Sequence, residues 1–367
     1  MKLLLVTGTR PNIVKMAPLY HELSRHSEID IVVVHTGQHY DKDLYNVFYS
    51  QFDLPRPHYD LNVRKGDPCD RVDAIISGMA SVLKKENPDY VVVFGDVDST
   101  FAAAVAARRG GIKLIHIEAG LRSFDLSMPE EMNRILVDRM SDMLFITEES
   151  GMKNLQAEGI SEDKCHLVGN ILIDAMDQFG FLKKGPMEEP FILWTIHRPS
   201  NVDEKSELQK VLDLLKVALD HCSVIWPVHP RTEKALKALE TDQDWSDLRH
   251  DDRLKLLKPE GYKQFTNLLA SSSVVVTDSG GVQEEACYLG VPCLTLRNNT
   301  ERPSTVEAGA NSLIYEKDKV LFEESLRRAI VSEGSWDIPP LWDGKTSRRT
   351  VEIILKSINT EVSNSYL

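Results

Sequence analysis

Residues 274–286, VVVTDSGGVQEEA, decide the fold class of this chain. The β-branched run predicts a buried strand, the Ser-Gly-Gly stretch a tight turn, and the following residues a helix. A strand that passes through a glycine turn into a helix is the unit of a parallel α/β sheet, and the N–H groups at the start of such a helix can bind a phosphate. Two glutamates, Glu284 and Glu285, follow in what we expect to be the first turn of the helix, where a bound anion would be repelled.

The same strand-and-helix pattern recurs along the chain. Short runs rich in Val, Ile and Leu are each followed by a stretch with helical spacing, and the runs lack the polar and apolar alternation of half-exposed strands. We therefore expect parallel strands covered on both faces. They are predicted at residues 2–8, 30–37, 90–96, 113–120 and 143–147 in the first half, and at 191–197, 223–229, 254–259, 273–280 and 292–297 in the second.

Two doubly wound, Rossmann-like domains follow from this repetition, because 367 residues are long for a single core. The Gly, Pro and charged residues of 177–190 indicate a connector. We expect a first domain at 1–172, joined by a C-terminal helix at about 346–367, and a second domain at 173–345.

Composition excludes several classes of partner. No segment approaches the roughly 18 uncharged apolar residues of a membrane span, and the opening LLLV is followed at once by TGTRP, so it predicts a first strand rather than a signal peptide. We expect a cytoplasmic protein. Five scattered cysteines without a C-x-x-C pair argue against disulfides and structural zinc. A net charge of −13 without a basic run makes nucleic acid a poor partner, whereas a phosphorylated small molecule remains possible.

Polar residues gather just after the predicted strands of the first half, where ligands of open parallel sheets bind. Arg10 and Lys15 follow the first strand, Asp96 and Asp98 the third, and Glu118 the fourth. Arg10 could instead close a loop. Asp96 and Asp98 could hold a hard cation, but we favour Asp98 as the N-cap of the next helix and keep Asp96 for function.

Other polar residues of the first half have simpler explanations. Glu130 and Glu131 follow Pro129, and acidic residues are favoured in the first turn of any helix by its dipole. His35 and His116 fall inside strands, so we expect hydrogen-bonded core histidines there.

The second half indicates a nucleotide site. His197 follows a strand, and its neighbour Arg198 favours a role near phosphate; His229 is a weaker candidate. The turn at 279–281 is neither G-x-G-x-x-G nor a Walker A loop, which removes the usual case for NAD or ATP. Glu285 lies four residues beyond the turn, on the same side of the helix, and a carboxylate there suits a ribose diol. Phosphate on the backbone and ribose on the acid together describe a nucleoside diphosphate, and Glu284 would then point to solvent.

Compound motifs along nearly the whole chain, from residue 1 to about 310, carry a resemblance. They are VTGTRPNIVKMAPL (6–19), TGQHYD (36–41), FGDVDST (94–100), HIEAGLRSFDLSMPEEMNR (116–134), VGNILIDA (168–175), TIHRPSN (195–201), PVHPR (227–231) and TDSGGVQEEACYLGVPCLTLRNNTERPSTVEAG (277–309). In this order they resemble the non-hydrolysing UDP-N-acetylglucosamine 2-epimerases. The resemblance implies a GT-B architecture with the active site between two Rossmann-like domains, a homodimer, and no cofactor or metal.

The resemblance also implies the reaction and the residues that perform it. UDP-GlcNAc and UDP-ManNAc would interconvert by loss of the C2 proton as UDP departs, through 2-acetamidoglucal, in a pathway of surface polysaccharide synthesis. The residues that match proton-handling positions, with Glu131 as the second glutamate of its motif, are Asp96, Glu118 and Glu130. Those that match positions around UDP and the sugar are Arg10, Lys15, His197, Ser279, Gly280, Gly281, Glu285 and Arg302. We place His197 with the catalytic residues.

Two departures limit what the resemblance implies. Many bacterial members bind a second UDP-GlcNAc as an activator through glutamines, but this chain has Asp41 and Asp67 at the matching positions, so activation is not implied. The stretch at 122–134 is shorter than in the best-known bacterial members. Related enzymes act on other UDP-2-acetamido sugars, which leaves the sugar open, and a GT-B glycosyltransferase or a UDP-sugar-binding regulator remains an alternative.

Overall fold

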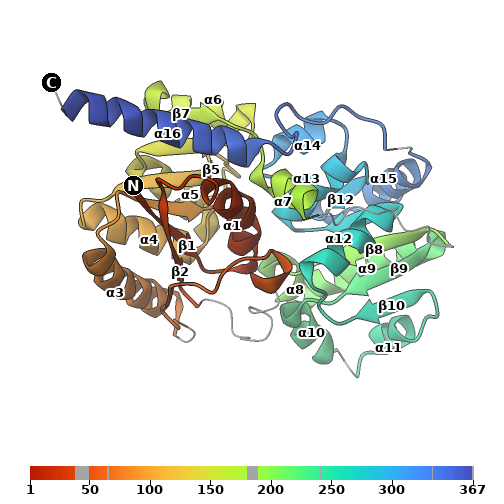
Figure 1. Ribbon diagram of the computed structural model, residues 1–367. Coiled ribbons are helices and arrows are strands. Elements are labelled where there is room, and N and C mark those ends of the chain that lie inside the picture. Colours follow the sequence, from red (N-terminus) through yellow and green to blue (C-terminus); the bar gives the residue numbers. More distant parts are fainter. Residues whose placement is uncertain (38–48, 64–65, 180–188, 240, 333, 366–367) are drawn as a thin grey trace. The chain divides into compact units, whose positions relative to one another are not determined.

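A computed structural model describes residues 1–37, 49–63, 66–179, 189–239, 241–332 and 334–365, with side chains in the last helix described as far as residue 357. The chain divides into two compact units (Figure 1). Unit 1 comprises residues 1–179 and 340–367, and unit 2 comprises 180–339. The chain passes from unit 1 to unit 2 between residues 179 and 180 and returns between 339 and 340, whereas the sequence pattern predicted these boundaries at 172/173 and 345/346.

Unit 1 contains a parallel sheet whose strands run in the order β3-β2-β1-β4-β5-β6-β7 within the described residues. Its centre has the strand order of a Rossmann fold. The strands are β1 (Lys2–Thr7), β2 (Asp30–His35), β3 (Tyr59–Asp60), β4 (Tyr90–Phe94), β5 (Lys113–Ala119), β6 (Met143–Ile146) and β7 (Cys165–Leu167).

Helices cover both faces of this sheet. On one face α3, α4 and α5 pack side by side, and a run of buried alanines in α4 brings that helix close to the strands. A second group, α1, α7 and α16, packs together, so the last helix of the chain belongs to unit 1. The elements are α1 (Arg10–Leu23), α3 (Pro68–Glu86), α4 (Asp98–Arg109), α5 (Pro129–Met140), α6 (Glu149–Ala157), η1 (Glu162–Lys164), α7 (Ile171–Gln178) and α16 (Thr346–Ser365).

Unit 2 repeats the design with a parallel sheet in the order β10-β9-β8-β11-β12-β13. Its largest core cluster surrounds the buried Trp194 and Trp226. The strands are β8 (Phe191–Thr195), β9 (Ser223–Pro227), β10 (Leu254–Leu257), β11 (Val274–Thr277), β12 (Cys293–Thr295) and β13 (Asn311–Leu313). The helices are α8 (Pro199–Val202), α9 (Lys205–His221), α10 (Pro230–Lys237), α11 (Gln243–Arg249), α12 (Tyr262–Ser271), α13 (Gly280–Leu289), α14 (Pro303–Glu307), η2 (Tyr315–Lys317) and α15 (Lys319–Val331).

The ten predicted strands are all present, and the prediction of two doubly wound parallel sheets is confirmed. The sequence missed β3, β7 and β13, which lie at sheet edges and have only two or three residues each. The expected N-cap at Asp98 is wrong by one residue: Val97 caps α4, and Asp98 is the first helical residue.

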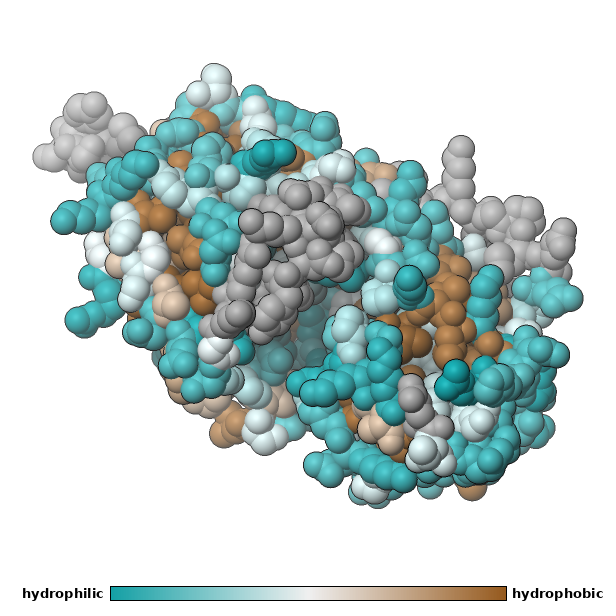
Figure 2. Space-filling view, turned by 90° about the horizontal axis from the view of Figure 1, so that it is seen from below, coloured by the Kyte–Doolittle hydropathy of each residue, from teal (hydrophilic) through white to brown (hydrophobic). Residues whose placement is uncertain are grey.

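No helix of the described chain is long and apolar enough to cross a membrane. On the face shown in Figure 2, hydrophobic side chains form separate groups among hydrophilic ones. This surface agrees with a chain whose charged residues make up 27% of the sequence.

Candidate active site

The start of α1 is fastened to the end of β4. The backbone N–H of Thr9, the N-cap of α1, donates to Asn12 Oδ1 at 3.1 Å, and Asn12 Nδ2 donates to the Phe94 carbonyl at 2.8 Å. Arg10 is the first residue of the helix, and Pro11 restricts the backbone there to the helical φ. About one turn after Pro11, this anchorage directs Lys15 toward the carboxyl ends of β4 and β5.

Lys15 and Glu118 form a buried ion pair at these strand ends. The Lys15 ammonium donates to Glu118 Oε2, and the two side chains are only 11% and 5% exposed. The pair lies against Gly95, where a Cβ atom would be 3.2 Å from Glu118 Oε2 and 3.3 Å from Lys15 Nζ. The first half therefore brings a predicted binding residue and a predicted catalytic residue into direct contact.

Glu118 has an unusual backbone. Its φ is +72°, in the left-handed region that non-glycine residues rarely adopt, and the pairing of β5 with β6 shifts register between Ile117 and Ala119. Such a conformation costs about 1–3 kcal/mol and persists only where surrounding contacts enforce it. The local break in the strand turns the Glu118 carboxylate toward Lys15.

Asp96 is held by an arginine that sequence reasoning missed. Arg134 Nε and Nη2 donate to Asp96 Oδ2 at 2.9 and 2.5 Å, while Arg134 Nη1 donates to Glu131 Oε2 at 2.6 Å. Glu131 is buried and also accepts the backbone N–H groups of Ser123 and Phe124 at 3.0 and 2.9 Å. Glu131 therefore shapes the loop before α5, while Asp96 keeps a quarter of its side-chain surface exposed.

Glu130 lies apart from these pairs. It is the second residue of α5 and is half-buried, and within the described part of the chain its carboxylate makes no ion pair or hydrogen bond. A carboxylate without a cationic partner differs chemically from Asp96 and Glu118, each of which faces a cation.

In unit 2, the turn after β11 faces a buried cluster of arginines. Glu301 accepts from Arg297 Nη2 and from Arg302 Nη1, both at 2.7 Å, and lies 3.5 Å from Arg198 Nη2. A Cβ atom on Gly280 would be 2.9 Å from Glu301 Oε1 and 3.0 Å from Arg302 Cζ, so only glycine lets the cluster approach the start of α13 this closely.

Acidic side chains pair with the arginines of this cluster. Besides Glu301, the cluster contains Glu284, whose Oε1 lies 3.4 Å from Arg302 Nε. Burial lowers the pKa of Arg297, and the charges of Arg198 and Arg302 lower it further, against the opposing effect of Glu301. Arginines beside the first N–H groups of a ten-residue helix are suited to an anion such as a diphosphate.

The two glutamates of α13 lie beyond its first turn, because the helix begins at Gly280. The expectation that Glu284 points to solvent is wrong: it is 1% exposed and pairs with Arg302. Glu285 is buried too, and Tyr262 donates its hydroxyl to Glu285 Oε1 at 2.8 Å. Burial and the Glu285 carboxylate raise the pKa of Tyr262 well above its ordinary value, so the phenol remains a donor that orients Glu285.

Asp278, one of the polar residues that follow the strands of the second half, organises the neighbouring strand end. Its fully buried carboxylate accepts the backbone N–H groups of His197 and Arg198 at 3.0 and 2.8 Å, and Asn201 Nδ2 at 2.9 Å. His197 Nδ1 lies 3.2 Å from Asp278 Oδ1, so Nδ1 donates to the carboxylate and the other ring nitrogen is left for a ligand. The ring remains 35% exposed.

Ser279, the N-cap of α13, donates its backbone N–H to Thr277 Oγ1 at 3.0 Å. The predicted site residues thus fall into two sets, each at the carboxyl ends of the strands of its own unit. The set in unit 1 is Arg10, Lys15, Asp96, Glu118 and Glu130, and the set in unit 2 is His197, Ser279, Gly280, Gly281, Glu285 and Arg302.

The core histidines are confirmed. His35 and His116 are 3% and 1% exposed, and His35 Nδ1 lies 3.2 Å from Thr7 Oγ1. Of the two activator positions, Asp41 lies outside the described residues. Asp67 caps α3 by accepting the backbone N–H of Asp70 at 3.0 Å.

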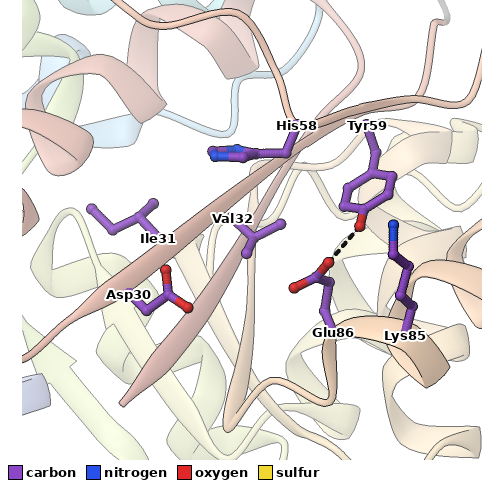
Figure 3. A pocket seen from close by; sticks show the side chains of 7 residues that line it. All are labelled: Asp30, Ile31, Val32, His58, Tyr59, Lys85 and Glu86. Carbon is purple, nitrogen blue, oxygen red and sulfur yellow. Dashed lines mark hydrogen bonds between the residues drawn. The ribbon is translucent and has the colours of Figure 1, made fainter.

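A pocket of about 340 Å³ lies elsewhere, at the amino-terminal end of β2 (Figure 3). Tyr59 donates to Glu86 across it, and Lys85 lies beside both. None of the predicted site residues lines this pocket, and the strand ends of a parallel sheet that bind ligands are the opposite ones. Within the described chain, no group of three or more His, Cys, Asp or Glu side chains is arranged to hold a metal ion.

Comparison with known proteins agrees with this geometry. The family model described as UDP-N-acetylglucosamine 2-epimerase matches residues 21–355. A UDP-N-acetylglucosamine 2-epimerase of Methanocaldococcus jannaschii is 38% identical over 367 residues, which is 96% of this chain and 99% of that protein. A UDP-2,3-diacetamido-2,3-dideoxy-D-glucuronate 2-epimerase of Pseudomonas aeruginosa is 33% identical, over 97% of this chain and all of that one.

Comparison with solved structures identifies the same family. The crystal structure of the Methanocaldococcus jannaschii UDP-GlcNAc 2-epimerase in complex with UDP-GlcNAc and UDP superposes with a TM-score of 0.89 at 37% identity, covering 97% of this chain and 100% of that one. The predicted fold, two Rossmann-like parallel-sheet units of GT-B type, is thereby confirmed.

Proposed function

The chain belongs to the UDP-N-acetylglucosamine 2-epimerase family, and on that premise we propose that it interconverts UDP-GlcNAc and UDP-ManNAc by inversion at C2. The observation that carries the proposal is the arginine cluster at the start of α13, whose guanidinium groups and helix N–H groups suit the diphosphate. Tyr262 and Glu285 beside the same helix supply an oriented carboxylate for the ribose hydroxyls.

The proposed chemistry is an anti elimination followed by re-addition. A base takes the C2 proton as the C1–O bond to UDP breaks, which forms the C1–C2 double bond of 2-acetamidoglucal. A proton is then delivered to the opposite face of C2 while a UDP oxygen reforms the bond to C1. No electron acceptor is needed, because the electrons of the C–H bond form the double bond and those of the C–O bond leave with UDP.

We assign the proton transfers to Asp96, Glu118 and Glu130, with His197 as a further catalytic group. These carboxylates differ in environment, since Asp96 faces Arg134, Glu118 faces Lys15, and Glu130 makes no such pair within the described residues. Carboxylates held in different environments are suited to different acid and base roles in one reaction. Lys15 and Arg10 would stabilise charge on the departing UDP.

The direct experiment uses purified protein and UDP-GlcNAc alone in D2O, followed by NMR. UDP-ManNAc with deuterium at C2 is expected. No change in the absence of an acceptor would favour a glycosyltransferase, and binding without turnover would favour a UDP-sugar sensor. ManNAc and free UDP as the main products would indicate hydrolysis rather than epimerisation.

The carboxylate variants Asp96→Asn, Glu118→Gln and Glu130→Gln test the assignment of roles. Each should fold and bind UDP, yet lose most of its turnover, because general acid–base groups contribute about 100- to 10,000-fold to rate. Wild-type turnover in any one of the three would remove that residue from the mechanism.

A related sugar is the second candidate, because the Pseudomonas aeruginosa relative, which acts on a diacetamido glucuronate, covers this chain as fully as the others. Comparing kcat/KM for UDP-GlcNAc with that for UDP-2,3-diacetamido-2,3-dideoxyglucuronate separates the two. We further propose a cytoplasmic homodimer that supplies surface polysaccharide synthesis, on the strength of family membership alone. Sedimentation velocity tests the dimer.

A further inference from the structure

One buried carboxylate, Asp138 of α5, braces the backbone on both sides of Glu118. Its side chain is fully buried and lies 2.7 Å from His116 Nδ1, 2.8 Å from Arg122 Nη2 and 3.1 Å from the Gly120 backbone N–H. His116 lies two residues before Glu118, Gly120 two after it and Arg122 four after it. These bonds therefore enclose the residue whose φ of +72° requires support.

The same contact network reaches the loop that carries Asp96. His116 Nε2 lies 2.8 Å from the Gly95 carbonyl, and the Gly95 N–H donates to the Ile117 carbonyl at 3.0 Å. A carbonyl oxygen only accepts, and the Asp138 carboxylate accepts at the other ring nitrogen. His116 therefore bridges the Asp138 carboxylate and the Gly95 carbonyl, and it fixes the residue that precedes Asp96.

Arg122 joins two carboxylates in this network. Its Nη2 lies 2.8 Å from Asp138 Oδ2, and its Nε donates to Glu158 Oε1 at 2.7 Å, so the network links the turn after β5 with α5 and the end of α6. Burial alone would raise the pKa of Asp138, but its bonds to His116 and Arg122 lower it below the ordinary value. The carboxylate is thus ionised at neutral pH and able to accept from all three donors.

We propose that Asp138 is a positioning residue for the epimerisation, which holds Glu118 in its left-handed conformation directly and Asp96 through His116. The proposal rests on the proposed function and extends it to a buried residue outside the predicted site. Without the three bonds, the backbone at Glu118 relaxes toward the extended conformation of its strand. The carboxylate then turns away from Lys15 and from the C2 proton.

The main test is Asp138→Asn, with Asp142→Asn as the matched control. Asp142 also accepts a backbone N–H, from Leu114, and an arginine, Arg108, both at 2.8 Å, but at the opposite end of β5. Misplacing a catalytic group by about 1 Å costs roughly 100-fold in rate, so we expect kcat of Asp138→Asn to fall by about that factor while KM and the Kd for UDP change by less than about threefold. Asp142→Asn should keep the wild-type kcat.

A double-mutant cycle separates positioning from general destabilisation. If Asp138 acts mainly through Glu118, adding Asp138→Asn to Glu118→Gln should lower kcat much less than it does in the wild type, since the carboxylate to be positioned is already absent. Full additivity would refute the positioning of Glu118 by Asp138, and a wild-type kcat in Asp138→Asn would overturn the whole proposal. Wild-type protein that fails to epimerise UDP-GlcNAc would instead refute the proposed function.

A second variant covers the case in which Asp138→Asn does not fold. His116→Asn places an amide where Nδ1 stood, so the bond to Asp138 is kept and the bond to the Gly95 carbonyl is lost. We expect kcat to fall about 10-fold with an unchanged Kd for UDP. A soluble His116→Asn protein with wild-type kcat would show that the link to the Asp96 loop has no positioning role.

Discussion

Replacing Lys15 by methionine should show how much the Lys15–Glu118 ion pair stabilises unit 1. Methionine fills most of the space of the lysine chain, so the change removes a charge without opening a large cavity. Lys15 and Glu118 are 11% and 5% exposed, and removing one partner of a buried ion pair costs about 3–5 kcal/mol because the other charge is left uncompensated. Since Glu118 lies at a strand end rather than at mid-core, we expect the lower end, about 3 kcal/mol.

Hydrogen–deuterium exchange followed by mass spectrometry measures this loss locally. The peptides that cover β4 and β5 report the free energy of opening of this sheet. A loss of about 3 kcal/mol corresponds to exchange on the order of 100-fold faster. Arg108→Gln is the control, because its ion pair with Asp142 is 43% and 29% exposed, and exchange should change little.

The double variant Lys15→Met/Glu118→Gln tests whether the uncompensated charge of Glu118 causes the loss of local stability. Once both charges are gone, no uncompensated carboxylate remains, and exchange should return to within about tenfold of the wild-type rate. If Lys15→Met leaves exchange within about threefold of wild type, or if the second substitution restores nothing, the buried pair is not what holds these strand ends.

Three further outcomes are expected. Glu285→Ala should lose roughly 10- to 100-fold of its affinity for UDP in calorimetric titration but little for pyrophosphate, because hydrogen bonds to a charged group contribute about 1.5–3 kcal/mol; equal losses would contradict the ribose assignment. The pKa of Asp138 is lowered from 3.8, so its stabilising contribution is present above that pH and is lost as the pH falls through the folded-state pKa; in urea titrations the gap between wild type and Asp138→Asn should be widest near neutral pH and narrow below about pH 4. EDTA should leave turnover unchanged, and a loss that Mg²⁺ restores would assign Asp96 and Asp98 to a metal.

The long strands and the positions of the polar residues after them could be predicted because the relevant forces are local in sequence. A strand buried on both faces must be apolar along its length, and a ligand edge must carry polar residues just beyond such runs. The same logic failed for the edge strands β3, β7 and β13, which are too short to show a pattern. Asp98 was misassigned by one residue because helix ends depend on backbone geometry that several neighbouring residues can satisfy.

The electrostatic partners could not be predicted, because each lies far along the chain. Glu284 is 18 residues from the arginine that neutralises it, and Asp278 accepts from residues about 80 positions earlier. In the sequence, Asp138 is one acidic residue within a helix, and its contact with the Gly120 N–H after β5 is established only by the tertiary structure.

The sequence by itself thus determined two doubly wound units, a glycine turn suited to a diphosphate, and the acids and cations at the strand ends. It also placed two glutamates, Glu284 and Glu285, beside an expected anion site, and the local sequence pattern could not explain how their charges are accommodated. Only the tertiary structure decided that Glu284 is matched by Arg302 and Glu285 is oriented by Tyr262. A buried charge persists only with a partner in space, and packing of the chain, rather than spacing along it, brings that partner near.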